Sequence, residues 1–499
     1  MSSRVLTAVI VAALAFTVTQ APASAEGDGA VVRTDKGAVK GAVTDAYRTF
    51  GAIPFAAPPV GENRWRDPQP VTPWRGVRDA TKPAPVCAQV AQLGMPGSDS
   101  EDCLYLNVTT PAARSAKPRP VMVWIHGGGF SNGAASQYDA RAFAAKTDAV
   151  VVTINYRLGA FGFFGYPGLP GSGAFGIADQ QAALRWVQRN ARAFGGNPRN
   201  VTIFGESAGG DSVCAQLASP RAAGLFGKAI IQSGPCAAAF PAGQPGQFVS
   251  VWQPRAEVEQ RGAAQPLGCA DIACLRALPV SKLLPVHGMF VSPAYDTAVL
   301  PISPQVAQQT GRMHRVPTLV GSTHDEATLF QALIQPAVVP ESQYRAQLAA
   351  VYGEDGAGRV AQRYPVNGNG DARDELAAVL TDDSWACPSH DTRRQLGSRA
   401  RVSGYEFADP DVPMIFPDMP PFPGGYRAYH ASELPLLFDF GVKLTPEQRE
   451  LSGYMISAWG RFARTGDPGW RAPVQSLAAG AVGPTDFVKD HKCDFWGAM

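Results

Sequence analysis

The sequence NVTIFGESAGG, residues 200–210, says more about the architecture of this chain than any other stretch. An apolar, β-branched run leads through Gly205 and Ser207 into the small residues 208–210. The pattern G-x-S-x-G places a serine in a sharp turn between a strand and a helix. Such a turn needs small neighbours, because larger side chains would collide with the adjacent strand or helix. The pattern therefore predicts that Ser207 is a candidate nucleophile at the positive end of a helix.

Strand-like and helix-like segments alternate on both sides of this turn. Strands are predicted within 120–130, 149–159, 200–205, 228–234, 316–323 and 402–409. Helices are predicted at 176–196, from Ser207 onward, and at 445–466. Strands separated by helices indicate an α/β fold with a mostly parallel central sheet and helices on both faces. Weak strand signals at 235–300 and 331–400 predict helical insertions and long loops over the sheet.

The helix predicted at 445–466 carries signals for both of its ends. Thr445 suits the N-cap, Pro446 the first helical position and Gln448 the capping box. Gly466 suits the end of the helix. These signals predict one long amphipathic helix near the end of the chain.

The composition is that of a large globular protein without a strong charge. The chain has 499 residues, of which 45% are hydrophobic and 17% charged, and its net charge is +2. This is enough apolar material for a large core. The weak charge argues against a nucleic-acid partner and against an anionic membrane surface, since both leave basic patches.

Residues 1–25 have the layout of a secretory signal peptide. Arg4 precedes an apolar run from Val5 to Val18, and Ala23-Ser24-Ala25 supplies a small-residue cleavage site. The alternative is a membrane anchor, but the apolar run is short for a span. We therefore expect an exported protein with a single catalytic domain at 26–499, and no integral membrane segment after cleavage.

Eight cysteines fit an oxidising compartment. Their spacing does not match a zinc site, because no CxxC pair faces another such pair or a pair of histidines. About 105 disulfide pairings are open to eight cysteines, and spacing alone does not choose among them.

A nucleophilic serine in this kind of turn is followed along the chain by an acid and then by a histidine. Six histidines lie downstream of Ser207, namely His287, His314, His324, His390, His430 and His491. The pattern by itself does not choose among them.

Long segments of the chain resemble the type-B carboxylesterase family, which includes the cholinesterases and fungal lipases. FGGNPRNVTIFGESAGG (194–210) is similar to the active-serine signature of that family, and EDCLYLNVTTP (101–111) to its second signature. Further resembling blocks, in family order, are WIHGGGF (124–130), NYRLGAFGF (155–163), DQQAALRWVQRN (179–190), HDEATLF (324–330), YHASELPLLF (429–438) and SAWGRFARTGDP (457–468). The resemblance implies an α/β-hydrolase fold over nearly all of residues 26–499.

The resemblance also implies a catalytic triad. Ser207 would be the nucleophile, Glu326 the acid and His430 the general base. Asp325 is adjacent to Glu326 and is kept as an alternative acid, since the motif tolerates either residue type. His324 is expected to be a surface or loop residue.

Main-chain donors for an oxyanion are implied at two places. The amides of Gly128 and Gly129 and the N–H of Ala208 would form the oxyanion hole, where the absence of side chains lets the backbone approach a tetrahedral intermediate. Glu206 and Ser233 are expected to support the site from behind, Glu206 through its charge or by holding a buried water network.

The family pattern suggests three disulfides. The implied pairs are Cys87 with Cys103, Cys269 with Cys274, and Cys387 with Cys493. Cys214 and Cys236 remain, and they are either a fourth pair or two buried thiols.

The implied activity is that of a secreted serine carboxylesterase that works through an acyl-enzyme, with an ester and water as its partners. No metal or organic cofactor is implied, and a monomer is expected. The loop CAQVAQLGMPGSDSEDC (87–103) has no aromatic residue, which disfavours a cation–π site for a quaternary ammonium and favours neutral esters. The alternatives are a lipase acting on long acyl chains and a non-catalytic binding protein on the same fold.

Overall fold

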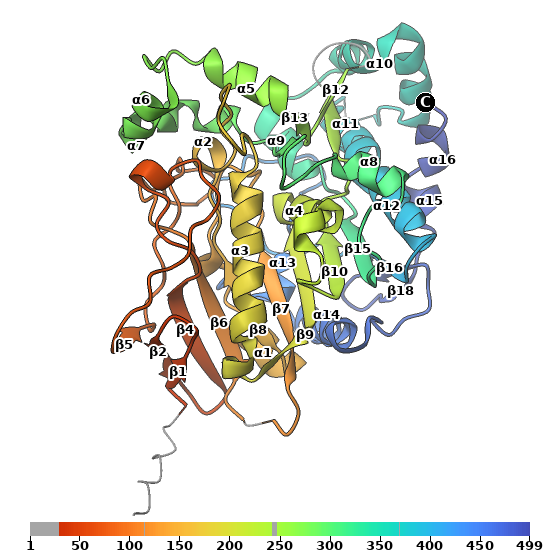
Figure 1. The fold of residues 1–499 in the computed structure, drawn as a ribbon. Helices are drawn as coiled ribbons and strands as arrows, with labels where there is room; N and C mark the ends of the chain where they lie inside the picture. Colours follow the sequence, from red (N-terminus) through yellow and green to blue (C-terminus); the bar gives the residue numbers. More distant parts are fainter. Residues whose placement is uncertain (1–28, 114, 242–246, 369) are drawn as a thin grey trace, which may run out of the picture.

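A large twisted sheet runs through the computed structural model, which describes residues 29–113, 115–241, 247–368 and 370–499 (Figure 1). The predicted signal peptide, residues 1–25, lies outside the described residues. In spatial order the eleven strands found within the described residues are β18 (Gly483–Pro484), β17 (Val474–Leu477), β16 (Val402–Phe407), β15 (Thr318–Thr323), β10 (Lys228–Gln232), β9 (Gly196–Glu206), β7 (Arg119–Ile125), β8 (Val150–Ile154), β6 (Tyr105–Pro111), β4 (Tyr47–Pro54) and β3 (Ala42–Val43).

The sheet is parallel in its middle and antiparallel at its edges. Every neighbouring pair from β17 to β8 is parallel. The pairs β18–β17, β8–β6, β6–β4 and β4–β3 are antiparallel. The predicted α/β fold with a mostly parallel sheet is confirmed. Strand β4 was not predicted, since most of its residues are only partly buried and its apolar pattern is correspondingly weak.

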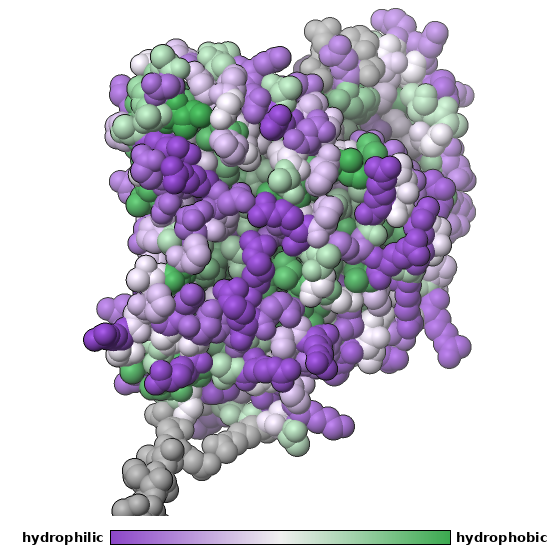
Figure 2. Space-filling model, viewed as in Figure 1, coloured by the Kyte–Doolittle hydropathy of each residue, from purple (hydrophilic) through white to green (hydrophobic). Residues whose placement is uncertain are grey.

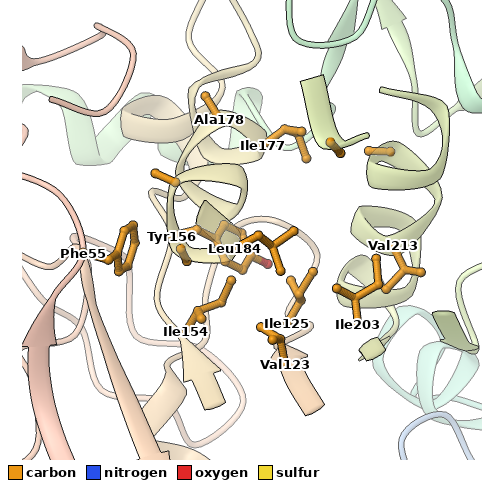
Figure 3. Close-up of a cluster of buried hydrophobic side chains, with 14 of the residues drawn as sticks. Phe55, Val123, Ile125, Ile154, Tyr156, Ile177, Ala178, Leu184, Ile203 and Val213 are labelled. Carbon is orange, nitrogen blue, oxygen red and sulfur yellow. The ribbon is translucent and has the colours of Figure 1, made fainter. Parts of the chain in front are cut away.

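Both faces of the sheet are covered, which explains the continuous apolar runs. Successive side chains of a strand point to opposite faces. In β7, Val123 belongs to one hydrophobic cluster and Trp124 to another. The first cluster includes Leu184 and Val213 on the helices of one face, and Figure 3 shows these side chains lying together with Val123. A strand buried on both faces carries no polar alternation.

Each face has its own set of helices. One face is covered by α3 (Phe175–Asn190), α4 (Ala208–Ala218), α8 (Pro304–Gln309) and α12 (Cys387–Gly397). The other face is covered by α1 (Arg141–Thr147), α13 (Leu434–Leu437) and α14 (Pro446–Thr465). Helix α14 has the predicted capping box, in which Thr445 Oγ1 accepts from Gln448 N (3.2 Å) and Gln448 Oε1 accepts from Thr445 N (3.0 Å). Gly466 ends it in a left-handed conformation with φ 76°.

Helical segments fill the two regions where strand signals are weak. Between β10 and β15 lie α5 (Arg255–Ala263), α6 (Ile272–Ala277) and α7 (Val280–Leu283), with the short pairs β11 (Ala239–Pro241)–β12 (Phe248–Ser250) and β13 (Gln253–Pro254)–β14 (Ala294–Tyr295). Between β15 and β16 lie α9 (Thr328–Ile334), α10 (Glu341–Arg363), α11 (Arg373–Thr381) and a π-helical turn at Asp382–Ala386. In Figure 1 most of these segments gather at the upper end of the molecule.

Shorter elements complete the described chain. They are the small sheet β1 (Val31–Arg33), β2 (Ala38–Lys40) and β5 (Val77–Asp79), and the helices α2 (Gly159–Gly162), α15 (Phe487–Asp490) and α16 (Cys493–Trp496). Figure 2 shows that polar side chains cover most of one face of the molecule and that hydrophobic patches on it are separated. Among the helices of the described chain, none is both long and apolar enough to cross a bilayer.

Four disulfides join all eight cysteines. The structure links Cys87 to Cys103, Cys269 to Cys274 and Cys387 to Cys493, as the family pattern suggests. It also links Cys214 to Cys236, the pairing that the sequence left open. The bond from Cys387 to Cys493 ties the last helices to the insertion between β15 and β16.

Candidate active site

Ser207 sits in a strained turn between β9 and α4. Its backbone has φ 57° and ψ −127°, a conformation that non-glycine residues rarely adopt. Two hydrogen bonds hold it: Ser207 N donates to Gln232 O (2.9 Å) in β10, and Asp211 N donates to Ser207 O (2.9 Å) in α4. Strain of this kind persists only where the surroundings enforce it, and such places are often functional sites.

The glycines on either side of Ser207 are required by close backbone contacts. A Cβ on Gly205 would lie 2.5 Å from the carbonyl carbon of Gly209. A Cβ on Gly209 would lie 2.0 Å from the carbonyl oxygen of Ile125 in β7. The G-x-S-x-G pattern is thus explained by the approach of three main-chain segments at one point.

Glu326 and His430, 104 residues apart in the sequence, meet in the buried interior. His430 Nδ1 lies 2.5 Å from Glu326 Oε2. The other carboxylate oxygen, Oε1, accepts a hydrogen bond from Thr323 N (2.9 Å) at the end of β15. Both side chains are buried. The Nδ1 contact fixes the ring orientation and directs Nε2 away from Glu326.

Asp325, the alternative acid, makes different contacts. Asp325 Oδ2 lies 3.0 Å from His324 Nδ1, and Asp325 Oδ1 accepts from Arg427 Nε (2.7 Å). His324 is on the exposed side of the same loop, with 46% of its side chain accessible. The two adjacent acids therefore have different partners, and the one in contact with His430 is Glu326.

Ser207 and His430 line the same cavity. His430 Nε2 has no hydrogen-bond partner among the described residues, and it lies 3.1 Å from Glu206 Oε1. The structure thus brings Ser207 and His430 to one cavity without a hydrogen bond between them. Hydrogen bonds of this kind are often loose without substrate and tighten in the reacting complex.

Buried carboxylates control the charge of His430. Burial by itself lowers its pKa, but the carboxylates of Glu206 and Glu326 outweigh burial and raise the pKa to about 9. Burial raises the pKa of Glu206 to about 8, against the opposing effect of His430. A proton on Glu206 removes one of the two charges that favour imidazolium. The basicity of His430 therefore depends on which of these groups carries the proton.

The glycine loop after β7 turns sharply beside Ser207. Gly128 has φ 102° and Gly129 has φ 59°, and a Cβ on Gly128 would lie 2.2 Å from Asn132 O. The amides of Ser131 (3.0 Å) and Asn132 (3.1 Å) donate to Gly128 O and close the turn. Gly128, Gly129 and Ala208 all line the cavity with Ser207. The first amides of a helix have no partner within the helix, so Ala208 N–H can serve a ligand.

Sequence analysis missed Glu433, three residues after His430. Its Oε1 accepts from Gln232 Nε2 (3.0 Å), and Gln232 Oε1 accepts from Trp459 Nε1 (3.0 Å). Burial raises the pKa of Glu433 to about 7. An acid in the apolar segment ASELPLLF is the signal that could have pointed to it. Ser233, the other expected supporting residue, is buried with φ 50° and lines the cavity.

The cavity has a volume of about 740 Å³. No lysine or arginine lines it among the described residues, and its acids are Glu206 and Asp211. Its aromatic lining residues are Phe130, Tyr138, Phe240, Phe330, Tyr352, Trp385, Phe416 and Phe440. Most of these come from loops and insertions, so the sheet positions the polar groups while other segments shape the apolar wall.

Comparison with known proteins agrees with this arrangement. The Carboxylesterase family matches residues 28–476. The chain is 35% identical to para-nitrobenzyl esterase of Bacillus subtilis (strain 168), covering 89% of this chain and 91% of that protein. It is 36% identical to acylcarnitine hydrolase of Mus musculus, covering 84% of this chain and 79% of the relative.

Two further similarities complete the comparison. Acetylcholinesterase of Bungarus fasciatus is 34% identical, with 88% of this chain and 78% of the relative covered. A solved structure titled PNB esterase superposes with a TM-score of 0.76 at 33% identity, over 93% of this chain and 99% of that one. The chain therefore belongs to the carboxylesterase family, has the α/β-hydrolase fold and is a carboxylic-ester hydrolase.

Proposed function

We propose that this protein is a secreted serine carboxylesterase that hydrolyses neutral esters through an acyl-enzyme on Ser207. The observation that carries the proposal is the 2.5 Å contact between His430 and Glu326, at the wall of the cavity that Ser207 also lines. A buried carboxylate on Nδ1 leaves Nε2 as the nitrogen that can take a proton. This is the arrangement that a serine nucleophile needs.

The proposed reaction has two steps. His430 Nε2 accepts the proton of Ser207 as Oγ attacks the ester carbonyl, and then returns the proton to the leaving alcohol. Water attacks the resulting acyl-enzyme in the second step, again with His430 as the base. Glu326 holds the imidazole in position and stabilises its charged form.

The negative charge of each tetrahedral intermediate needs main-chain donors. We assign this role to the amides of Gly128, Gly129 and Ala208, which line the cavity around Ser207. One such donor contributes about 3–4 kcal/mol to transition-state stabilisation in enzymes of this type. The left-handed conformation of Gly128 and Gly129 supports the assignment, because the turn brings backbone rather than side chains to the cavity.

The cavity favours uncharged substrates. Its wall is aromatic and aliphatic, and among the described residues it has no lysine or arginine for an anionic substrate. The loop between Cys87 and Cys103 carries no aromatic residue for a quaternary ammonium. A neutral ester with a bulky acyl or alcohol part fits a volume of about 740 Å³.

Export belongs to the same proposal. The sequence of residues 1–25 has the order of a signal peptide, and four disulfides are typical of an oxidising compartment. We propose cleavage after Ala25 and a mature single-domain monomer of residues 26–499. The N-terminal sequence of protein recovered from the culture medium tests the cleavage site.

A lipase that acts on long acyl chains is the second candidate. Ile334 and Val249 line the cavity and yet are 66% and 45% exposed, which puts apolar side chains at its mouth. Phe248 and Leu333, their neighbours in the sequence, are 39% and 43% exposed. An apolar rim of this kind suits contact with a lipid surface.

A series of nitrophenyl esters from acetate to palmitate separates the candidates. We expect the highest kcat/KM with short or medium chains, without activation above the solubility limit, and no turnover by Ser207→Ala. A maximum at long chains with activation at the interface would favour the lipase. Absence of turnover with every ester would favour a non-catalytic binding protein.

A further inference from the structure

A cluster of two histidines and a glutamate lies outside the ester cavity. His324 follows β15, Glu406 is in β16, and His491 follows α15 near the end of the chain. Each side chain offers one ligand atom, and the three atoms lie within 4.8 Å of one another. We propose that these three residues form a binding site for a divalent transition metal such as Zn²⁺, which clamps the C-terminal segment to the loop that carries Glu326.

The ligand types suit zinc. Imidazole nitrogens and a carboxylate oxygen bind Zn²⁺ at about 2.0–2.2 Å, and ligands around a tetrahedral ion are then about 3.3 Å apart. His491 Nε2 lies 2.6 Å from Glu406 Oε1. To seat the ion, this contact has to lengthen by about 0.7 Å, and separations of up to 4.8 Å have to shorten by at most about 1.5 Å, with water as the fourth ligand.

Both histidines are already oriented by carboxylates on their other nitrogen. His491 Nδ1 lies 2.5 Å from Asp382 Oδ1, and His324 Nδ1 lies 3.0 Å from Asp325 Oδ2. A carboxylate that accepts from Nδ1–H fixes the tautomer and makes Nε2 the nitrogen for a metal, which at His491 would replace the contact with Glu406 Oε1. This supporting arrangement occurs twice in the cluster, once on the partly exposed His324 and once on the buried His491.

The orienting carboxylates have cationic partners of their own. Asp382 lies 3.6 Å from Lys492 Nζ, and Asp325 pairs with Arg427. Glu406, which contacts His491 Nε2, is the carboxylate within the cluster itself. The buried guanidinium of Arg393 interacts electrostatically with Glu406, so the ion has to compete with one positive charge.

A proton on His491 would compete with a metal ion for this cluster. A protonated His491 between Asp382 and Glu406 would form a buried ion triad without a metal. That arrangement has no need of His324, whose ring centre lies 5.2 Å from that of His491. His324 is also 46% exposed, which gives an ion a route from solvent to the buried pair. His324 therefore distinguishes the metal site from the proton-bridged triad.

The position of the cluster gives the metal a structural role. Backbone hydrogen bonds link His324 N to Phe407 O (2.8 Å) and Asp325 N to Ala428 O (2.9 Å), so the loop already joins two other segments. A metal would add a third connection, to the tail that Cys493 anchors. Because metal binds the folded chain in preference to the unfolded chain, it should raise the unfolding temperature.

Calorimetric titration of the chelator-treated full-length mature protein with ZnCl₂ tests the site. We expect one Zn²⁺ per chain and a higher unfolding temperature in zinc than in chelator. His324→Gln should weaken binding at least tenfold and abolish the temperature shift. Asp325→Asn should weaken binding by about 10–100-fold through loss of ring orientation.

Two controls protect the interpretation. His314→Gln removes a partly buried histidine that is not in the cluster and should leave zinc affinity unchanged. X-ray absorption at the zinc edge of the wild-type protein should show two imidazole nitrogens at about 2.0–2.1 Å and an oxygen at a similar distance. Wild-type protein that binds no zinc, equal affinity in His324→Gln, or a zinc spectrum without histidine would overturn the proposal. None of these readouts depends on esterase activity.

Discussion

The two halves of the proposed active site are built in different ways. Ser207 and the glycines around it are neighbours in the sequence, and their geometry comes from contacts between main-chain atoms. Glu326 and His430 are far apart in the sequence and meet through a buried contact between charged side chains. The first half is held by sterics, and the second by electrostatics and by the fold as a whole.

This difference predicts how each half will fail. A change of volume beside Ser207 should disturb folding, because backbone segments must move apart. A change of charge at Glu326 or His430 should disturb catalysis first, because the surrounding structure keeps its shape. The following substitutions break one half at a time.

Ser207→Ala should have the largest effect. Removal of Oγ eliminates the acyl-enzyme route, and kcat should fall by about 10⁶-fold, as with other serine hydrolases. The substitution removes one oxygen and no buried partner, so the unfolding temperature should change little. Steady-state kinetics on the best nitrophenyl ester would measure kcat, and circular dichroism on the same preparation would measure the unfolding temperature. Retention of even a hundredth of the wild-type kcat would rule out Ser207 as the nucleophile.

Glu326→Gln should have the second-largest effect on catalysis. We expect kcat to fall by about 10⁴-fold with little change in KM. The amide no longer stabilises the imidazolium and can present the wrong group to Nδ1. Single-turnover measurements would show whether acylation is the slowed step.

Asp325→Asn is the matched control for that substitution. It removes the adjacent carboxylate, which faces His324 and Arg427 instead of His430. We expect kcat to fall by less than about tenfold, since the Asp325 carboxylate is not in contact with the imidazole of His430. If the two variants lost activity equally, the choice of Glu326 as the acid would be wrong.

Gly209→Ala tests the steric half. Its Cβ would lie 2.0 Å from the carbonyl oxygen of Ile125, so β7 and α4 have to separate. We expect a loss of about 3 kcal/mol in the free energy of unfolding, the upper end for overpacking. Chemical denaturation followed by fluorescence would measure it. Gly453→Ala in α14 is the control: its Cβ would meet no atom within 4 Å, and a gain of about 0.5–1 kcal/mol is expected.

Glu206→Gln should give the smallest effect, a shift in the pH dependence. The Glu206 carboxylate raises the pKa of His430, and activity requires neutral His430. Its removal should therefore lower that pKa and move the acid limb of the kcat/KM profile to lower pH by about 1 unit. The Glu433 carboxylate raises the pKa of His430 more weakly than Glu206 does. Glu433→Gln should therefore move the acid limb in the same direction but by less. An unchanged limb, or one at higher pH, would contradict this role for Glu206.

The steric half could be predicted from the sequence because its causes are local. The run before Gly205, the small residues after Ser207 and the caps of α14 each act within a few residues. The central strands were predictable for a similar reason, since burial on both faces leaves continuous apolar runs. Strand β4, next to the edge strand β3, is only partly buried over most of its length; its apolar pattern is weaker, and it was missed.

The electrostatic half could not be derived from spacing. Six histidines follow Ser207, and only family resemblance pointed to His430. The structure shows why: His430 meets Glu326 through a loop after β15 and a separate loop before α13, and no local pattern records that meeting. Glu433 and the cluster around His491 escaped prediction for the same reason, because their partners are brought together by the sheet.

The most direct test of the proposed mechanism is to trap the acyl-enzyme. The protein would be mixed with a slowly hydrolysed nitrophenyl ester, quenched in acid, and examined by intact mass and peptide mapping. One acyl group per chain on the peptide that contains Ser207, absent in Ser207→Ala, is the predicted result. An acyl group on another residue of the wild-type protein, or turnover by Ser207→Ala at an undiminished rate, would contradict it.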